Sequence, residues 1–165
     1  MRRRLAWLLF AVVLAAGTYA GILLATPSSG FVSTTLAVAR FGEIDVKNFT
    51  DPADIWQARL KTHGLSDVYV QSNVWAPGGT SGWHTHPGHS LILVMAGTVT
   101  AYEGDDPTCT PHVYSQGMGF VDPGGDHVHV LRNEGPIEAR TTTVQLIPAA
   151  AARRIDVAAP GNCAF

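Results

Sequence analysis

From residue 56 onward, apolar and polar residues alternate along short stretches of the chain. In the segment WQARLK, residues 56–61, every second residue is apolar, and Val68, Val70 and Val74 continue the alternation further along. Successive side chains of a β-strand point to opposite sides of the sheet, so a period of two favours strand over helix. The pattern therefore predicts β-strands in this part of the chain.

Turn sequences rich in glycine and proline recur at short intervals between these stretches. They are Pro77-Gly78-Gly79, Pro87-Gly88, Ala96-Gly97, Gly104-Asp105-Asp106-Pro107, Gln116-Gly117, Pro123-Gly124-Gly125 and Glu134-Gly135-Pro136. Many short strands separated in this way are typical of an antiparallel sandwich or barrel. The chain has 165 residues, which is enough for one core but too little for two. We therefore expect one all-β domain.

The first 25 residues follow a different pattern. Residues 5–25 form an uncharged, mostly apolar run, and Arg2, Arg3 and Arg4 precede it. As a helix this run would be roughly 31 Å long, which matches the hydrocarbon core of a bilayer. The arginines favour a cytoplasmic N-terminus and export of the remaining chain. Residues 1–25 are therefore predicted to be an N-terminal hydrophobic helix, either an uncleaved transmembrane anchor or a cleaved signal peptide.

The remaining chain is then expected to act outside the cytoplasm, membrane-anchored or secreted. Residues 26–30, TPSSG, are typical of a short linker, which places the barrel domain and a C-terminal tail in residues 31–165. The two cysteines, Cys109 and Cys163, both lie in turn-rich sequence. An even cysteine count in an oxidising compartment favours a disulfide bond between them.

The charge of the chain argues against nucleic-acid partners. The net charge is −2, and without the three N-terminal arginines eight basic residues remain against 13 acidic ones. A surface of that sign gives no electrostatic footprint for DNA or RNA. The partners that we expect are a small-molecule ligand, the membrane if the N-terminal segment is uncleaved, and a second copy of the chain in a homodimer.

Five of the seven histidines fall in two short tracts. His84, His86 and His89 lie in GWHTHPGHS, and His127 and His129 lie in GGDHVHV. Residues two apart in a strand share a face, so His84 and His86 point the same way, as do His127 and His129. If the two strands face each other inside a barrel, three or four imidazoles converge. Imidazole nitrogens suit zinc, copper, iron and nickel, whereas calcium and magnesium prefer oxygen ligands.

The two tracts resemble the two motifs of the cupin family. The first motif, G-x5-H-x-H-x3,4-E-x6-G, fits Gly78, His84, His86, position 90 and Gly97; the second, G-x5-P-x-G-x2-H-x3-N, begins on Gly117, Pro123 and Gly125 and ends on His129 and Asn133. The resemblance covers roughly residues 66–147. It implies a single antiparallel β-barrel of the cupin or jelly-roll type. It also implies one divalent transition metal, such as Fe, Mn, Ni, Cu or Zn, held by the motif histidines.

The second motif departs from the family pattern in its spacing. One extra residue lies between Gly125 and His129. Counting back from Asn133 selects His129 as a ligand, whereas counting forward from Gly125 falls on Val128, with His127 one step short. We favour His129, because the strand after the turn sets the register better than a glycine-rich turn that tolerates insertion. His127 is then an additional ligand or a hydrogen-bond donor to the residues that bind the metal.

The first motif departs from the pattern at its carboxylate. Ser90 occupies the position of the usual glutamate ligand, so the predicted ligands are His84, His86 and His129, with Ser90 beside them. His89, one residue earlier, should face the opposite way and lie at the surface. Three neutral imidazoles leave the +2 charge of the ion uncompensated, where a glutamate would reduce it to +1. Such a site should attract an anionic ligand and leave a coordination position open for it.

Two functions are compatible with these residues. Some cupin-like thiol dioxygenases have a comparable three-histidine centre, so the resemblance implies dioxygenase-like or related oxidoreductase chemistry on a small anionic molecule. The alternative is a non-catalytic barrel that binds or senses a small molecule or a metal. A cupin barrel supports many reactions, so the fold alone does not decide between the two.

Overall fold

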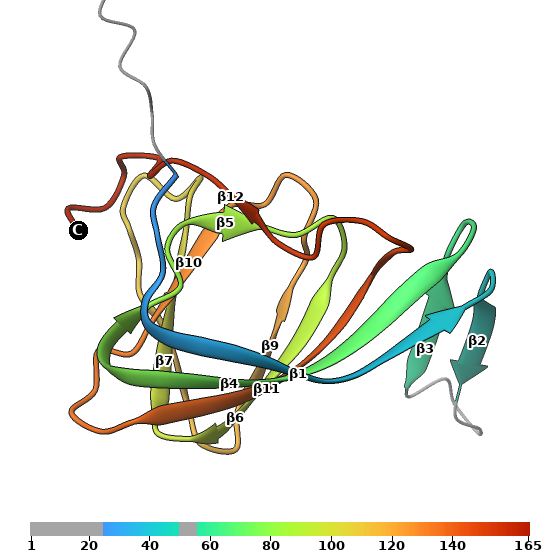
Figure 1. The fold of residues 1–165 in the computed structure, drawn as a ribbon, viewed down its shortest axis with the longest axis horizontal. Coiled ribbons are helices and arrows are strands. Elements are labelled where there is room, and N and C mark those ends of the chain that lie inside the picture. The colour runs from blue at the N-terminus through green and yellow to red at the C-terminus, as the bar shows by residue number, and fades with distance from the viewer. Residues whose placement is uncertain (1–24, 50–55) are drawn as a thin grey trace, which may run out of the picture.

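The computed structural model describes residues 25–49 and 56–165, and Figure 1 shows them as a β-barrel with a hairpin that projects from one side. The described residues contain no helix. Among them, therefore, no helix is long and apolar enough to cross a membrane. Residues 1–24 of the hydrophobic helix expected for residues 1–25 lie outside the described part of the chain.

Twelve strands make up this part of the chain. They are β1 (Ser29–Phe41), β2 (Asp45–Phe49), β3 (Gln57–Lys61), β4 (Ser66–Thr80), β5 (His84–Thr85), β6 (Ser90–Ala96), β7 (Thr98–Glu103), β8 (His112–Ser115), β9 (Gly119–Asp122), β10 (His129–Arg132), β11 (Ala139–Pro148) and β12 (Ile155–Asp156). All their pairings are antiparallel. The all-β prediction is therefore confirmed for the described residues.

Ten of the strands form one sheet that curls into a nearly closed barrel (Figure 1). Strands β1, β4, β11, β6 and β9 follow one another across one wall. Strands β12, β5, β10, β7 and β8 make up the second wall, which joins β4 at the pair Thr80–Arg132. The alternation in β6 shows how the sequence builds a wall: Ser90, Ile92 and Val94 are buried, and the residues between them are exposed.

The remaining two strands, β2 and β3, pair only with each other and project from the barrel (Figure 1). Of the alternating segment 56–61, residues 57–61 thus form a strand, as predicted, but the side chains are almost all exposed. A period of two identifies a strand without showing what its apolar side packs against.

The apolar core lies in two clusters. One consists of Trp75, Val99, Ala101, Leu131 and Ala139, and the other of Trp83, Tyr102 and Val130. Much of the remaining interior is polar, with Gln71, Asn73, Thr141, Thr143 and Gln145 buried on β4 and β11. Buried polar groups need hydrogen-bond partners, and Asn73 Nδ2 donates to the hydroxyl groups of both Thr141 and Thr143. One side of the barrel interior, formed by β4 and β11, is therefore a polar wall.

Both ends of the described domain pack against the same end of the barrel (Figure 1). Strand β12 pairs with β5, and Asp156 lies opposite His84. In the segment expected to be a linker, Thr26 Oγ1 accepts a hydrogen bond from Trp83 N at 2.6 Å and donates one to Val157 O at 3.3 Å. The histidine-bearing strand β5 is therefore held by the first and the last segments of the domain.

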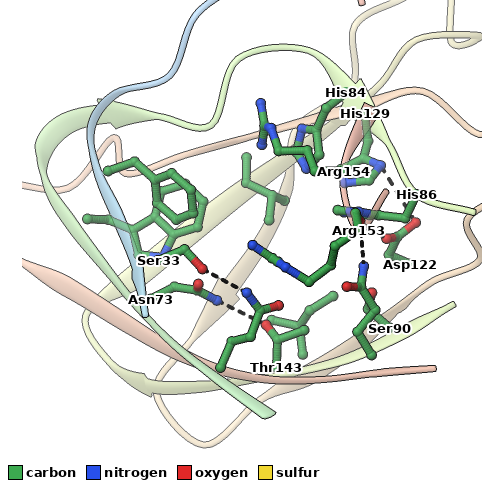
Figure 2. A pocket seen from close by; sticks show the side chains of 16 residues that line it. Ser33, Asn73, His84, His86, Ser90, Asp122, His129, Thr143, Arg153 and Arg154 are labelled. Carbon is green, nitrogen blue, oxygen red and sulfur yellow. Dashed lines mark hydrogen bonds and ion pairs between the residues drawn. The ribbon is translucent and has the colours of Figure 1, made fainter. Parts of the chain in front are cut away.

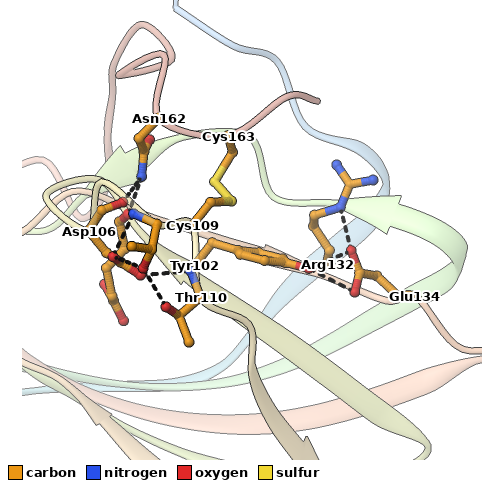
Figure 3. The surroundings of a disulfide bond; sticks show 10 residues. Tyr102, Asp106, Cys109, Thr110, Arg132, Glu134, Asn162 and Cys163 are labelled. Carbon is orange, nitrogen blue, oxygen red and sulfur yellow. Dashed lines mark hydrogen bonds and ion pairs between the residues drawn. A yellow bond between two sulfur atoms is a disulfide. The ribbon is translucent and has the colours of Figure 1, made fainter.

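The predicted disulfide bond between Cys109 and Cys163 is confirmed (Figure 3). It joins the β7–β8 loop to the C-terminal segment, across 54 positions of sequence. The cysteine pair is reinforced by Asn162, whose side-chain amide donates to Glu103 O at 2.8 Å and Asp106 O at 2.7 Å. The tail is thus fastened covalently and by hydrogen bonds across the end of the barrel.

Candidate metal centre

Two neighbouring strands bring three histidines together inside the barrel (Figure 2). His84 begins β5, His86 follows that strand, and His129 begins β10, where it pairs with His84. The ring centroids of His129 and His84 are 4.4 Å apart, and those of His129 and His86 are 5.5 Å apart. One nitrogen of each ring lies within 4.8 Å of the other two. The spacing is suited to a single metal ion.

Backbone carbonyl groups orient two of these rings. The Nδ1 atom of His84 lies 2.9 Å from Gly82 O, and the Nδ1 atom of His86 lies 2.7 Å from Arg153 O. A carbonyl oxygen only accepts, so each Nδ1 carries the proton and each Nε2 keeps a free lone pair. This support of the outer nitrogen is a common feature of metal-binding histidines.

Burial keeps the three rings neutral. It lowers the pKa of His84 strongly, it lowers the pKa of His86, and it lowers the pKa of His129 to about 4. Neutral imidazole is the form that coordinates a metal. The three rings are therefore in the binding form at neutral pH.

His127 lies beside this group rather than in it. Its Nε2 atom is 2.9 Å from a carboxylate oxygen of Glu103, and its Nδ1 atom is 3.9 Å from Asp122 Oδ1. His127, His129 and Asp122 form a second set of side chains close enough to hold an ion. His129 belongs to both sets, so the assignment of His129 rather than His127 as the motif ligand stays a prediction.

Ser90 lies at the cavity as expected, and His89 is exposed at the surface. The buried Ser90 hydroxyl has no hydrogen-bond partner among the described residues. Sequence reasoning missed Asp122, the last residue of β9, which pairs with Ser90 on the neighbouring strand β6. Its only sequence signal is that it directly precedes Pro123 of the second motif.

A cavity of about 80 Å³ lies beside the three histidines, inside the polar wall (Figure 2). Sequence reasoning also missed Arg153 and Arg154, which come from the C-terminal segment and line this cavity. Arg154 is engaged by Asp156 and by the carbonyl group of Ser81. Burial lowers the pKa of Arg153, and no acidic side chain among the described residues pairs with it. The cavity wall thus carries a cation that is available to a ligand.

Comparison with known proteins identifies the domain. Residues 74–145 match the family model described as a cupin domain. They include the four histidines of the two sets and Asp122. The chain therefore contains a cupin domain, and the family resemblance drawn from the two motifs is confirmed. No curated protein matches the chain.

Solved structures that resemble the chain have diverse descriptions. An oxalate oxidase is 26% identical with a TM-score of 0.42, and the match covers 50% of this chain and 46% of that one. A cupin superfamily protein from Desulfitobacterium hafniense is 14% identical with a TM-score of 0.47, covering 75% of this chain and 84% of that one. A protein with a double-stranded β-helix domain from Klebsiella pneumoniae is 22% identical with a TM-score of 0.44, covering 56% and 74%. This chain spans less than half of the oxalate oxidase.

Proposed function

We propose that this protein binds one divalent transition metal ion through His84, His86 and His129 and acts on a small anionic molecule in the adjacent cavity. The observation that carries the proposal is the convergence of three buried imidazoles, two of them with Nδ1 fixed by a carbonyl group. Bound there, a redox-active metal would supply dioxygenase-like or related oxidoreductase chemistry.

The surroundings of the histidines fit a metal ion. Buried polar atoms are normally hydrogen-bonded, yet His129 Nδ1, Ser90 Oγ and Asp122 Oδ2 have no hydrogen-bond partner in the described part of the chain. All three residues line the same cavity. Such a concentration of unsatisfied groups is unfavourable in a protein that holds nothing there, and an ion with its ligand relieves it.

The expected charge of the ligand follows from Arg153. Its guanidinium group is partly buried beside the cavity, and burial disfavours its charged form. An anion in the cavity would restore the electrostatic stabilisation that burial removes, and an arginine offers a carboxylate two parallel hydrogen bonds. The volume of about 80 Å³ restricts the ligand to a small molecule.

We further propose that the protein acts outside the cytoplasm, anchored by residues 1–25 or released after their cleavage. The Cys109–Cys163 disulfide bond supports this location, because disulfide bonds persist in oxidising compartments. The test is to determine, by mass spectrometry, the N-terminus of the protein isolated from the membrane fraction and from the soluble fraction. A reduced protein with an intact N-terminus in the cytoplasm would contradict the proposal.

Metal analysis of the full chain, purified without metal-affinity resin, tests the metal site. We expect close to one transition-metal ion per chain in the parent and in His89→Ala. Protein that remains metal-free when a chelator-buffered series of Fe, Mn, Ni, Cu and Zn is offered would overturn the proposal.

Anion binding is tested separately by calorimetry of the metal-loaded protein with a panel of small carboxylates, thiolates and phenolates. We expect Arg153→Met to weaken binding of the anion without changing the metal content, whereas Arg140→Met, which alters an exposed arginine paired with Glu138, should change neither. Oxygen uptake with the bound anion identifies an enzyme, and binding without turnover identifies the non-catalytic barrel.

A further inference from the structure

We propose that Asp122 is the fourth protein ligand of the metal, and that it replaces the carboxylate that is missing at position 90. The inference rests on the proposed metal site and adds a ligand to it. Ser90 on β6 and Asp122 on β9 are direct partners in the antiparallel pairing of the two strands. Side chains of paired residues lie on the same face of a sheet, with Cβ atoms about 5 Å apart. A carboxylate can therefore approach the same point in the cavity from either strand.

The position of the carboxylate fits this role. Asp122 Oδ2 lies 3.5 Å from His86 Nε2, and the Asp122 side chain is only 3% exposed. Two neighbouring ligand atoms on one ion, each about 2.1 Å from it, are separated by roughly 3.0–3.5 Å. The contact between Asp122 and His86 therefore has the length expected for two ligands that share an ion.

The two oxygens of Asp122 have different surroundings. Oδ1 accepts a hydrogen bond from Gly124 N at 2.9 Å and lies 3.6 Å from His129 Nδ1. Oδ2 is buried without a hydrogen-bond partner among the described residues. An ionised carboxylate oxygen buried in this way is costly unless a cation is beside it. The fixed oxygen thus sets the orientation of the carboxylate, and the free oxygen faces the Nε2 atom of His86.

The second set of residues, Asp122, His127 and His129, offers a competing position for the ion. His127 is available to that position, because its Nε2 atom is supported by Glu103 and its Nδ1 atom has no hydrogen-bond partner among the described residues. The carboxylate would have to bind the ion there through Oδ1, however, which already accepts a hydrogen bond from Gly124. The unpaired Oδ2 atom instead faces His86, which belongs only to the three-histidine set. The geometry therefore favours Asp122 as a ligand together with His84, His86 and His129.

This assignment changes the expected charge of the site. With three imidazoles and one carboxylate, a divalent ion leaves a net charge of +1 instead of +2. The absence of a carboxylate at position 90 predicted that the charge of the metal attracts an anionic ligand, and with Asp122 bound that attraction is weaker. Arg153 becomes the main source of attraction for an anionic ligand.

The test compares metal affinity in four versions of the full chain: the parent, Asp122→Asn, Glu103→Gln and the double variant Ser90→Glu/Asp122→Asn. Asparagine retains the Oδ1 acceptor for Gly124 and removes the charge. Glu103→Gln is the matched control, because Glu103 pairs with His127 rather than with the three-histidine set. Affinity is measured with Co²⁺ by competition with a chelator, the absorption spectrum of bound Co²⁺ reports the ligand set, and circular dichroism confirms folding.

We expect Asp122→Asn to weaken Co²⁺ binding by at least about tenfold and to change the spectrum, while Glu103→Gln leaves both unchanged. The glutamate at position 90 should restore affinity in the double variant, because it supplies the carboxylate from the neighbouring strand. Unchanged affinity in Asp122→Asn, equal losses in Asp122→Asn and Glu103→Gln, or no recovery in a folded double variant would each overturn the assignment. A parent protein that binds no metal would instead refute the proposed function.

Discussion

Reduction of the Cys109–Cys163 disulfide bond should lower the stability of the domain substantially. The bond closes a loop across 54 positions of sequence. In the chain-entropy model, breaking the bond increases the conformational entropy of the unfolded state. The free energy of unfolding then falls by about 4 kcal/mol. For a domain of residues 26–165, unfolding entropy scales with length, and this loss corresponds to a decrease in Tm of roughly 10–15 °C.

The reduced protein should nevertheless remain folded at room temperature. Phe165 packs against Tyr102 with ring centroids 4.9 Å apart, and the guanidinium carbon of Arg132 lies 4.0 Å from the centre of the Phe165 ring. Asn162 adds two hydrogen bonds to backbone carbonyl groups. These contacts hold the tail in place without the covalent bond, so reduction should shift the transition without abolishing it.

Thermal unfolding followed by circular dichroism, with and without reductant, measures the shift. The double variant Cys109→Ser/Cys163→Ser is the control: it should unfold near the temperature of the reduced parent and should not respond to reductant. Intact mass of the non-reduced parent should be two hydrogen atoms below that of the reduced form. A parent whose Tm does not change although its mass shows complete reduction would refute the entropic argument.

Three further predictions follow from the site and the core. His129→Ala should remove stoichiometric metal binding, measured by elemental analysis, while His89→Ala should retain it; equal retention in both would exclude His129 as a ligand. The ion pair with Arg40 lowers the pKa of Asp67 to about 2, below its value of about 3.9 in the unfolded chain. The stabilising contribution of the Asp67 carboxylate is therefore complete above about pH 4 and is lost as the pH falls toward 2. Asp67→Asn should thus flatten the acid limb of the plot of unfolding free energy against pH, and an unchanged limb would contradict this. Trp75→Ala should lower the free energy of unfolding by about 3–5 kcal/mol in denaturant titrations, because Trp75 is 1% exposed, and a loss below about 1 kcal/mol would show that the side chain is not core.

Much of the fold follows from local sequence, because alternation and turn residues act over a few neighbours. The alternation predicted strands around residues 56–61 and 68–74, where β3 and β4 lie. Of the expected turns, Pro77-Gly78-Gly79 is wrong, because these residues lie within β4. The pattern could not place β3 in the exposed hairpin with β2, because burial depends on contacts with distant segments. Nor could it predict that Gln71 and Gln145 point into the barrel, because a polar cavity reverses the usual rule that buried positions are apolar.

The site was only partly predictable for a similar reason. His84 and His86 are two residues apart, so their common face follows from strand geometry alone, and the structure brings His129 to them across the β5–β10 pairing. Asp122 reaches the same point only through the register between β6 and β9, which no local pattern specifies. Arg153 lines the cavity because the C-terminal tail crosses the end of the barrel, where it contacts distant segments through the β12–β5 pairing and the disulfide bond, and no local pattern specifies these contacts.

The covalent ring closed by Cys109 and Cys163 also determines what a protease could release. Asp122, His129 and Arg153 all lie between the two cysteines in sequence. A single backbone cut anywhere between the cysteines therefore leaves both pieces attached to the same molecule, and the cavity keeps every one of its side chains. Cleavage after Arg153, for example, would yield a nicked protein of almost unchanged mass that separates into two fragments only on reduction. A cut of that kind in the C-terminal segment beside the cavity would therefore not detach any part of the protein as long as the disulfide bond stays oxidised.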